Sequence, residues 1–142
     1  MSFLLDTNVI SEVARSKPNP GIERWFRHVP GEALHLSVLT LGEIRKGIER
    51  LGASARREKL RVWLESELPD WFEDRILGVD AAVAERWGRL LSEVKRPVPA
   101  VDSILAATAL HHGLRFVTRN TADFDYPGLE IVDPWAPPAP SP

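Results

Sequence analysis

The stretch Ser2-Phe3-Leu4-Leu5-Asp6-Thr7-Asn8 decides the fold class. Three consecutive apolar residues, followed at once by an acid and two short polar side chains, are typical of a brief strand buried on both faces. Asp6 then lies at the carboxyl end of that strand, where ligands bind in open α/β sheets. The same residue would also serve as the N-cap of a helix over residues 9–14. From this segment alone, capping and function both remain open for Asp6.

Helical and extended patterns alternate along the rest of the chain. Apolar residues at spacings of three and four over residues 41–51 predict an amphipathic helix, with Glu43 off its apolar stripe and Gly47 leaving open space beside it. Residues 100–110 are apolar or small almost all round, which indicates a helix buried on most sides. We expect further helices at residues 22–28, 54–68 and 80–94, strands at 3–5, 34–38, 115–118 and 129–132, and a short apolar link at 75–79.

This alternation predicts a parallel sheet with helices on both faces, in one compact α/β domain with three layers, α/β/α. We expect the helices at 54–68 and 80–94 to pair as an inserted helical hairpin. The domain is expected to cover residues 1–135. Residues 136–142 contain four of the chain's twelve prolines, which predicts a disordered or polyproline-like tail.

Composition excludes several classes of function. The chain has 142 residues and no cysteine, so disulfides, a thiolate metal site and a cysteine nucleophile are impossible, and a reducing cytoplasm is the expected location. We find no signal-peptide pattern and no apolar run approaching the roughly 18 residues of a membrane span. The net charge of −2 does not decide for or against nucleic acid, because bound metal would offset clustered acids.

Four acids follow or open elements that should meet at one edge of a parallel sheet: Asp6, Glu43, Asp102 and Asp123. Carboxylates about 4 Å apart in a poorly solvated site repel by several kcal/mol, and a divalent ion removes that conflict. All-oxygen ligands favour Mg²⁺ or Mn²⁺ over zinc. The chemistry this suggests is attack of an activated water on a phosphodiester.

Each of these acids also has a simpler explanation. Asp102 could cap a helix, Asp123 could sit in an Asx-turn, and Glu43 could face solvent. No pair of the four histidines has the spacing of zinc ligands. Three polar side chains expected at the same edge would support the acids: Asn8, Thr118 and Asn120. Three cations are candidates for contact with a phosphate backbone, although a solvated basic face explains them equally well: Arg45, Lys46 and Arg119.

Four stretches closely resemble the motifs of PIN-domain proteins, and in particular the FitB-like group of the VapC toxins. They are LDTNVISE at residues 5–12, SVLTLGEI at 37–44, VDSILAATA at 101–109 and VTRNTADF at 117–124. The closing GLEIVDPW at residues 128–135 is similar to theirs as well. Any one of these motifs is weak evidence, but together and in order they are specific.

The resemblance implies a PIN-like fold and a Mg²⁺- or Mn²⁺-dependent endoribonuclease, the toxin of a type II toxin–antitoxin pair. Asp6, Glu43, Asp102 and Asp123 match the acidic positions of the family. We expect Asp6 and Asp102 to hold the principal ion, while Glu43 and Asp123 complete the cluster or position a second ion or the attacking water. The resemblance further implies an RNA substrate, a VapB-type antitoxin, and a homodimer that can form a larger complex with that antitoxin.

Two other functions are compatible with the sequence. Asp6 could be the nucleophile of an aspartyl-phosphate phosphohydrolase, although that chemistry usually needs a second acid two residues later, where this chain has Asn8. A non-catalytic PIN-like binding module is the second, since helices that carry tryptophan suit a partner groove. A module of that kind would have no chemical need to keep all four acids.

Overall fold

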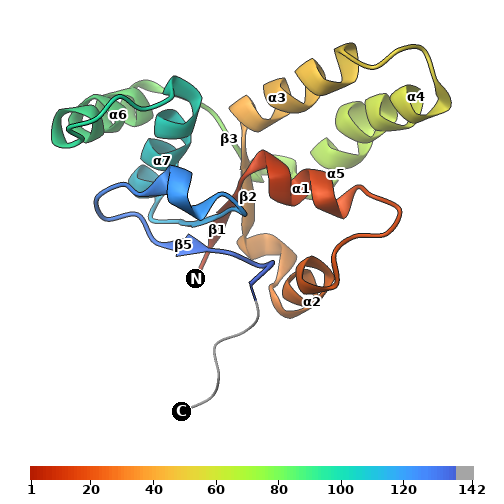
Figure 1. Ribbon diagram of the computed structural model, residues 1–142, viewed down its shortest axis with the longest axis horizontal. Coiled ribbons are helices and arrows are strands. Elements are labelled where there is room, and N and C mark those ends of the chain that lie inside the picture. The colour runs from red at the N-terminus through yellow and green to blue at the C-terminus, as the bar shows by residue number, and fades with distance from the viewer. Residues whose placement is uncertain (137–142) are drawn as a thin grey trace.

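The computed structural model describes residues 1–136, so the predicted tail lies outside the described residues except for Ala136. Strands and helices alternate along the chain (Figure 1). The strands are β1 (Phe3–Leu5), β2 (Leu34–Ser37), β3 (Ile76–Leu77), β4 (Arg115–Val117) and β5 (Ile131–Val132). The helices are α1 (Thr7–Val13), α2 (Pro20–His28), α3 (Val38–Glu49), α4 (Ala55–Val62), α5 (Leu68–Phe72), α6 (Ala81–Glu93) and α7 (Ala100–His112).

The sheet has five strands in the order β3-β2-β1-β4-β5, and every neighbouring pair is parallel. β1 is central, with Phe3 opposite Leu34 of β2 and Arg115 of β4. Side chains of a strand alternate between the two faces of a sheet. Phe3 and Leu5 therefore enter one hydrophobic core and Leu4 enters the other, which explains why all three residues are apolar.

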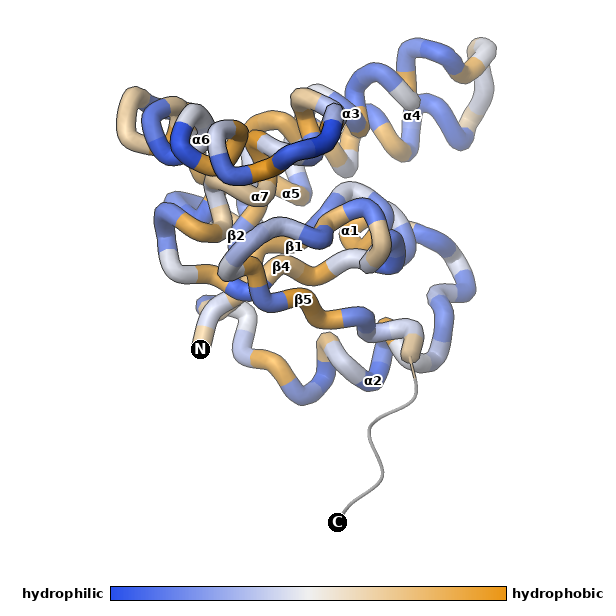
Figure 2. The backbone as a smooth tube through the Cα atoms, turned by 60° about the vertical axis from the view of Figure 1, so that its left-hand side comes forward, coloured by the Kyte–Doolittle hydropathy of each residue, from blue (hydrophilic) through white to orange (hydrophobic). Residues whose placement is uncertain are grey.

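Helices cover both faces of this sheet and give the predicted three layers (Figure 1). Buried residues of α1, α2, α3 and α5 form the core on one face, and those of α6 and α7 form the core on the other. Leu4 and Leu5 are fully buried, and burying each contributes about 2 kcal/mol. In Figure 2 the strands run as hydrophobic segments between the layers, while α4 carries many hydrophilic residues.

Two local predictions about how the elements pair are wrong. The expected link at 75–79 contains strand β3, because Ile76 and Leu77 pair with Leu36 and Ser37 at the sheet edge. After β3, the chain continues on the opposite face of the sheet from α4, and α6 packs there against α7. The helices predicted at 54–68 and 80–94 therefore do not form the hairpin. The hairpin instead joins α3 and α4, which lie side by side in Figure 1.

The helix predicted over residues 54–68 does not end there, because the helical course of the chain continues through Pro69. α4 passes through a π-helical turn at Trp63–Glu67 into α5, where Pro69 occupies the first turn. A proline is tolerated there because the first N–H groups of a helix have no intrahelical partner. Among residues 1–136, we find no helix with both the length and the hydropathy needed to span a bilayer.

Candidate active site

Asp6 emerges from the carboxyl end of β1, and it has both of the roles that the sequence left open. Its Oδ1 accepts a hydrogen bond from the backbone N–H of Thr7 at 2.8 Å, which caps α1. Burial raises the pKa of the same carboxyl group, and the charges of Glu43 and Asp102 add to that rise. Capping fixes the carboxylate at the strand end and leaves Oδ2 facing the site.

Oδ2 of Asp6 is held by the loop that follows β4. The Thr118 hydroxyl donates to it at 2.8 Å, and the Asn8 amide lies at 3.4 Å. Thr118 is fully buried and also accepts from Asn8 Nδ2 at 3.3 Å and from the backbone N–H of Asn120 at 3.0 Å. Of the three supporting residues predicted from sequence, Asn8 and Thr118 act through their side chains, while the observed contact of Asn120 is made by its backbone.

Glu43 reaches the site from the second turn of α3. Ser37, the last residue of β2, caps this helix by accepting from the N–H of Leu39 at 3.1 Å. The hydroxyl of Thr7 donates to Glu43 Oε1 at 2.7 Å. Glu43 is exposed, as one explanation from sequence allowed, but this bond fixes it beside the end of β1.

Asp102 and Asp123 approach from the opposite face of the sheet. Asp102 lies in the first turn of α7, whose N-cap is Pro99, so Asp102 is not the capping residue. Asp123 lies in the short 3₁₀ helix Thr121–Phe124 that follows β4. A helix start carries partial positive charge that favours an anion, which suits Asp102 and a nearby phosphate.

Burial and the charges of neighbouring acids act together on the carboxyl groups of Asp6 and Asp102. Burial raises the pKa of Asp6 to about 6, against hydrogen bonds from Thr118 and Thr7 that lower it, and the charges of Glu43 and Asp102 raise it further. Burial also raises the pKa of Asp102, with added repulsion from Asp123 and Glu43. Asp6, Glu43, Asp102 and Asp123 are called the acidic site below.

The donor chemistry of the acidic site fits a hard divalent cation. Carboxylates that raise one another's pKa are relieved when a cation binds between them. Within residues 1–136, no three acidic or histidine side chains converge as a ready-made metal cluster. Mg²⁺ does not require one, since it is usually held by one or two carboxylates and keeps several waters.

The three cations predicted to contact RNA have different surroundings. Arg45 forms ion pairs with Glu49 at 3.7 Å and with Glu65 at 2.7 Å. The Arg119 guanidinium lies 5.4 Å from the ring centre of Trp135. Lys46 is exposed on α3. None of these surroundings tests contact with RNA, so the role of the three cations stays a prediction.

Sequence reasoning gave no role to two residues that the fold brings to the site. Thr7 stands in the sequence only as part of a motif, yet it is the partner of Glu43. Tyr126 is buried, and its hydroxyl has no hydrogen-bond partner among the described residues. Burial and then the charge of Asp102 raise the pKa of Tyr126, opposed by Arg96 and assisted by Asp123. In the sequence, only the position of Tyr126, two residues after the end of the VTRNTADF motif at Phe124, associates it with the site.

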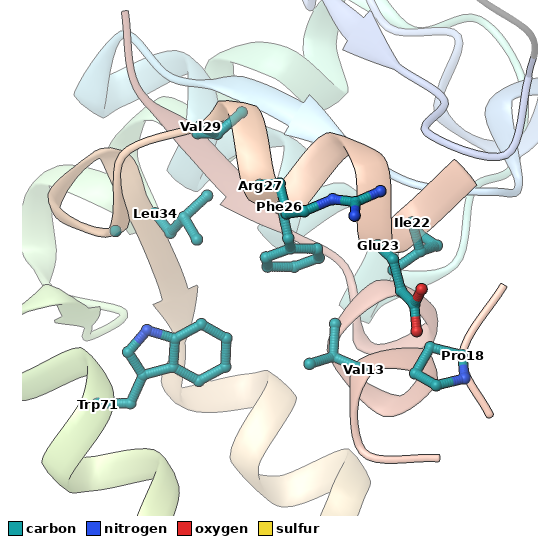
Figure 3. A pocket seen from close by; sticks show the side chains of 10 residues that line it. Val13, Pro18, Ile22, Glu23, Phe26, Arg27, Val29, Leu34 and Trp71 are labelled. Carbon is teal, nitrogen blue, oxygen red and sulfur yellow. The ribbon is translucent and has the colours of Figure 1, made fainter. Parts of the chain in front are cut away.

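An apolar pocket of ≈ 500 Å³ lies away from the acidic site, between α1, α2 and α5 (Figure 3). Its wall includes Ile22, Phe26, Leu34 and Trp71, and Leu34 is the first residue of β2. The acidic site is at the other end of the strands. This pocket therefore does not contribute to the chemistry of the acids.

A parallel sheet with helices on both faces and acids near its carboxyl edge defines a three-layer α/β protein with an acidic site. The chain belongs to the PIN domain family, whose model matches residues 3–127. It is 35% identical to the toxin FitB of Neisseria gonorrhoeae over 94% of this chain and 98% of that protein. It is 34% identical to the VapC ribonuclease Y4jK of Sinorhizobium fredii, over 95% and 99% of the two chains.

Among solved structures, the crystal structure of FitAcB from Neisseria gonorrhoeae superposes with a TM-score of 0.86 at 34% identity. The match covers 94% of this chain and 98% of that chain. The fold class and the family expected from the sequence are therefore confirmed. The site residues and the metal expected with them are not tested by these comparisons.

Proposed function

We propose that this protein is a Mg²⁺- or Mn²⁺-dependent endoribonuclease and the toxin of a type II toxin–antitoxin pair. Relatives that match almost the whole chain are named a toxin and a ribonuclease, which supports this class of activity. The observation that carries the proposal is the position of Asp6, a buried carboxylate that Thr118 and Thr7 hold at the carboxyl end of β1; burial and neighbouring acids also raise its pKa to about 6. Perturbed carboxylates gathered at a sheet edge are typical of catalytic and ion-binding sites.

Asp6 and Asp102 would hold the principal ion in this proposal. When bound, the ion would neutralise charge on the scissile phosphate and acidify a water molecule. Asp123 and Glu43 would complete the site. Thr118 and Asn8 keep Oδ2 of Asp6 in place, so that little reorganisation accompanies binding.

Glu43 would position the attacking water in this proposal and accept its proton. Its Oε1 is occupied by the Thr7 hydroxyl, which fixes the orientation of the carboxylate and leaves the second oxygen available. The water oxygen would add to phosphorus as the bond from phosphorus to the leaving oxygen breaks. The N-terminal turn of α7 presents partial positive charge to the same phosphate.

A VapB-type antitoxin is the proposed protein partner, because one relative is named as a toxin and the other as a VapC protein. A homodimer, and a larger complex with the antitoxin, are proposed with it. Co-expression with the neighbouring small reading frame, followed by purification and measurement of the mass of the complex, tests both proposals. A chain that remains monomeric and binds no product of that frame would contradict them.

The decisive experiment for the activity maps new RNA ends by sequencing after the purified protein acts on total cellular RNA. We expect cleavage with Mg²⁺ or Mn²⁺, and none in excess chelator or with Asp6→Asn. Asp70→Asn is the matched control, because Asp70 is exposed on α5 and outside the acidic site. Cleavage that persists in the chelator or in Asp6→Asn would overturn the proposal.

Two results would indicate the alternative functions instead. A covalent phosphate on Asp6, trapped from a phosphorylated substrate, would indicate the phosphohydrolase. This outcome is disfavoured by Asn8, which acts as an amide donor to Asp6 and Thr118 at the position where a second acid is needed. Absence of divalent-ion binding by calorimetry would indicate a binding module without catalysis.

A further inference from the structure

A second pocket of ≈ 470 Å³ adjoins the acidic site and shares Glu43 with it. Thr7, the partner of Glu43, lines the pocket as well, and from there the pocket extends between α1, α3 and α4. A substrate strand lying at the acidic site has to continue over a neighbouring surface. This pocket is a surface that begins at the acids themselves.

Two cations along the pocket are free for a ligand. Arg56 and Lys59 of α4 line it, and neither has an ion-pair partner among residues 1–136. Arg57 and Arg61 of the same helix do not line the pocket, and both are paired with glutamates. Among residues 1–136, the paired arginines of α4 therefore lie outside the pocket lining, and the two cations that line the pocket have no ion-pair partner. A third cation, Arg15 of the turn after α1, lines the pocket with its side chain 69% exposed, although it pairs with a glutamate of α1.

Part of the pocket lining is apolar. Trp63, Leu60 and Ile48 contribute to it, and Trp63 is half-buried, so part of its indole remains accessible. An aromatic ring beside cations matches a nucleotide, whose base stacks on the ring while its phosphates meet the cations. An apolar surface alone would not distinguish a nucleotide from a peptide side chain.

We propose that this basic pocket binds a nucleotide of single-stranded RNA next to the phosphodiester that is cut. This proposal rests on the proposed ribonuclease function, because that function brings the RNA strand to the acidic site. Binding of RNA in the pocket requires no cleavage. From the sequence, the candidates for phosphate contact were Arg45, Lys46 and Arg119, and a solvated basic face explained them equally well. Arg45 is paired with Glu49 and Glu65, whereas Arg56 and Lys59 of the pocket have no ion-pair partner within the described part of the chain.

Gly47 offers a steric test of the pocket. It lines the pocket in the middle of α3, and a Cβ at this position meets no atom within 4 Å. Gly47→Leu therefore fills open space, and replacing a helical glycine does not cost helix stability. Gly88→Leu is the matched control, because Gly88 lies in α6 on the other face of the sheet and also has open space.

The experiment measures binding of a fluorescein-labelled octaribonucleotide of mixed sequence to the full chain in excess EDTA, by fluorescence anisotropy. We expect Gly47→Leu and the double variant Arg56→Ala/Lys59→Ala each to weaken affinity by at least about 10-fold. The double variant should also show a shallower dependence of affinity on salt, by roughly 0.7 in the logarithmic slope for each phosphate that is no longer neutralised. Gly88→Leu should bind as the natural chain does.

A charge-matched control uses Arg24→Ala/Arg27→Ala, which removes two exposed cations from α2, outside the pocket. Thermal melts report whether each variant folds. Equal binding and cutting by the pocket variants and their controls would overturn the proposal, and would leave an acidic peptide as the better occupant. RNA binding that depends on the pocket without any metal-dependent cleavage would instead refute the proposed function and leave the subsite in place.

Discussion

The acidic site and the apolar pocket of Figure 3 lie at opposite ends of β2, and the two regions have opposite effects on the stability of the fold. The apolar pocket sits over the core beneath α2, where side chains such as Ile22 are fully buried. The acidic site accumulates carboxylates that repel one another and raise the pKa of Asp6 and of Asp102. The first region stabilises the fold, and the second is maintained at a cost to it.

This difference teaches that a hollow by itself does not mark the functional site. The apolar pocket and the basic pocket are similar in size, ≈ 500 and ≈ 470 Å³. Its charged lining residues, Glu23 and Arg27, are exposed, and they are not close to the acids. The site is recognised by convergent charge at strand ends, and four measurements would sharpen or break the contrast.

The largest expected effect is on cleavage by Asp102→Asn. Removing one proposed ion ligand should reduce the rate on the order of 1,000-fold. Stability should not fall, because burial and repulsion already raise the pKa of the Asp102 carboxyl. Rates on the mapped RNA and urea unfolding at neutral pH provide the two readouts. If Asp102→Asn lost stability but kept its cleavage rate, Asp102 would stabilise the fold and would not serve the chemistry.

Ile22→Ala should show the opposite pattern. Ile22 is fully buried and lines the apolar pocket, so its truncation should cost about 3 kcal/mol in the free energy of unfolding. Cleavage per folded molecule should stay within roughly twofold of the natural chain below the melting temperature. A large drop in rate in the folded variant would show that the apolar region serves the chemistry after all.

The pH dependence of the unfolding free energy measures how much the ionised, buried carboxylate of Asp6 destabilises the fold. Its pKa is raised from 3.8 to about 6, so folding disfavours the ionised form. The contribution to stability is therefore full below about pH 4 and is lost as the pH rises through about 6, by up to about 3 kcal/mol. Urea unfolding in EDTA between about pH 4 and pH 7.5 measures it.

Asp6→Asn should remove most of this pH dependence, since the amide does not titrate in that range. A saturating divalent ion should flatten the curve of the natural chain as well, because ion binding favours the deprotonated carboxylate. Parallel curves for Asp6→Asn and the natural chain in EDTA would show that Asp6 carries no such cost.

The smallest expected effect concerns Tyr126, which lies on the α7 side of the site. Tyr126→Phe removes a buried hydroxyl with no partner among the described residues, and it keeps the ring beside Phe124. Unfolding free energy should rise by up to about 1 kcal/mol. A decrease in stability would instead indicate that the hydroxyl is bonded, for example through a water that bridges to Asp102.

Several features of the fold and the site could be predicted because they depend on local pattern. The buried strand at Phe3–Leu5 follows from its apolar run, and Asp6 follows at its end. The buried helix beginning near Asp102 follows from residues that are small or apolar on almost every side. The parallel sheet follows from the alternation of strands and helices, since parallel strands need crossover connections.

Other features could not be predicted because they depend on partners distant in the chain. Two residues, Ile76 and Leu77, show no periodicity, and they become a strand only because the edge of β2 is open to pairing. The hairpin was assigned to the wrong helices because amphipathic stripes say which face is buried but not against what. Arg45 and Arg56 look alike in the sequence, and only the fold pairs Arg45 with Glu65 and turns Arg56 to the pocket.

The sequence by itself determined the fold class of this protein, most of its helices and strands, and the acids worth testing, because these follow from periodicity and from the chemistry of each side chain. Only the tertiary structure decided that Thr118 donates to Asp6 in particular, that Thr7 holds Glu43, and which cations have no ion-pair partner among residues 1–136. The physical reason is that hydrogen bonds and ion pairs act over a few ångströms, across 112 positions of the chain for Thr118 and Asp6. Their formation depends on packing that local pattern does not contain.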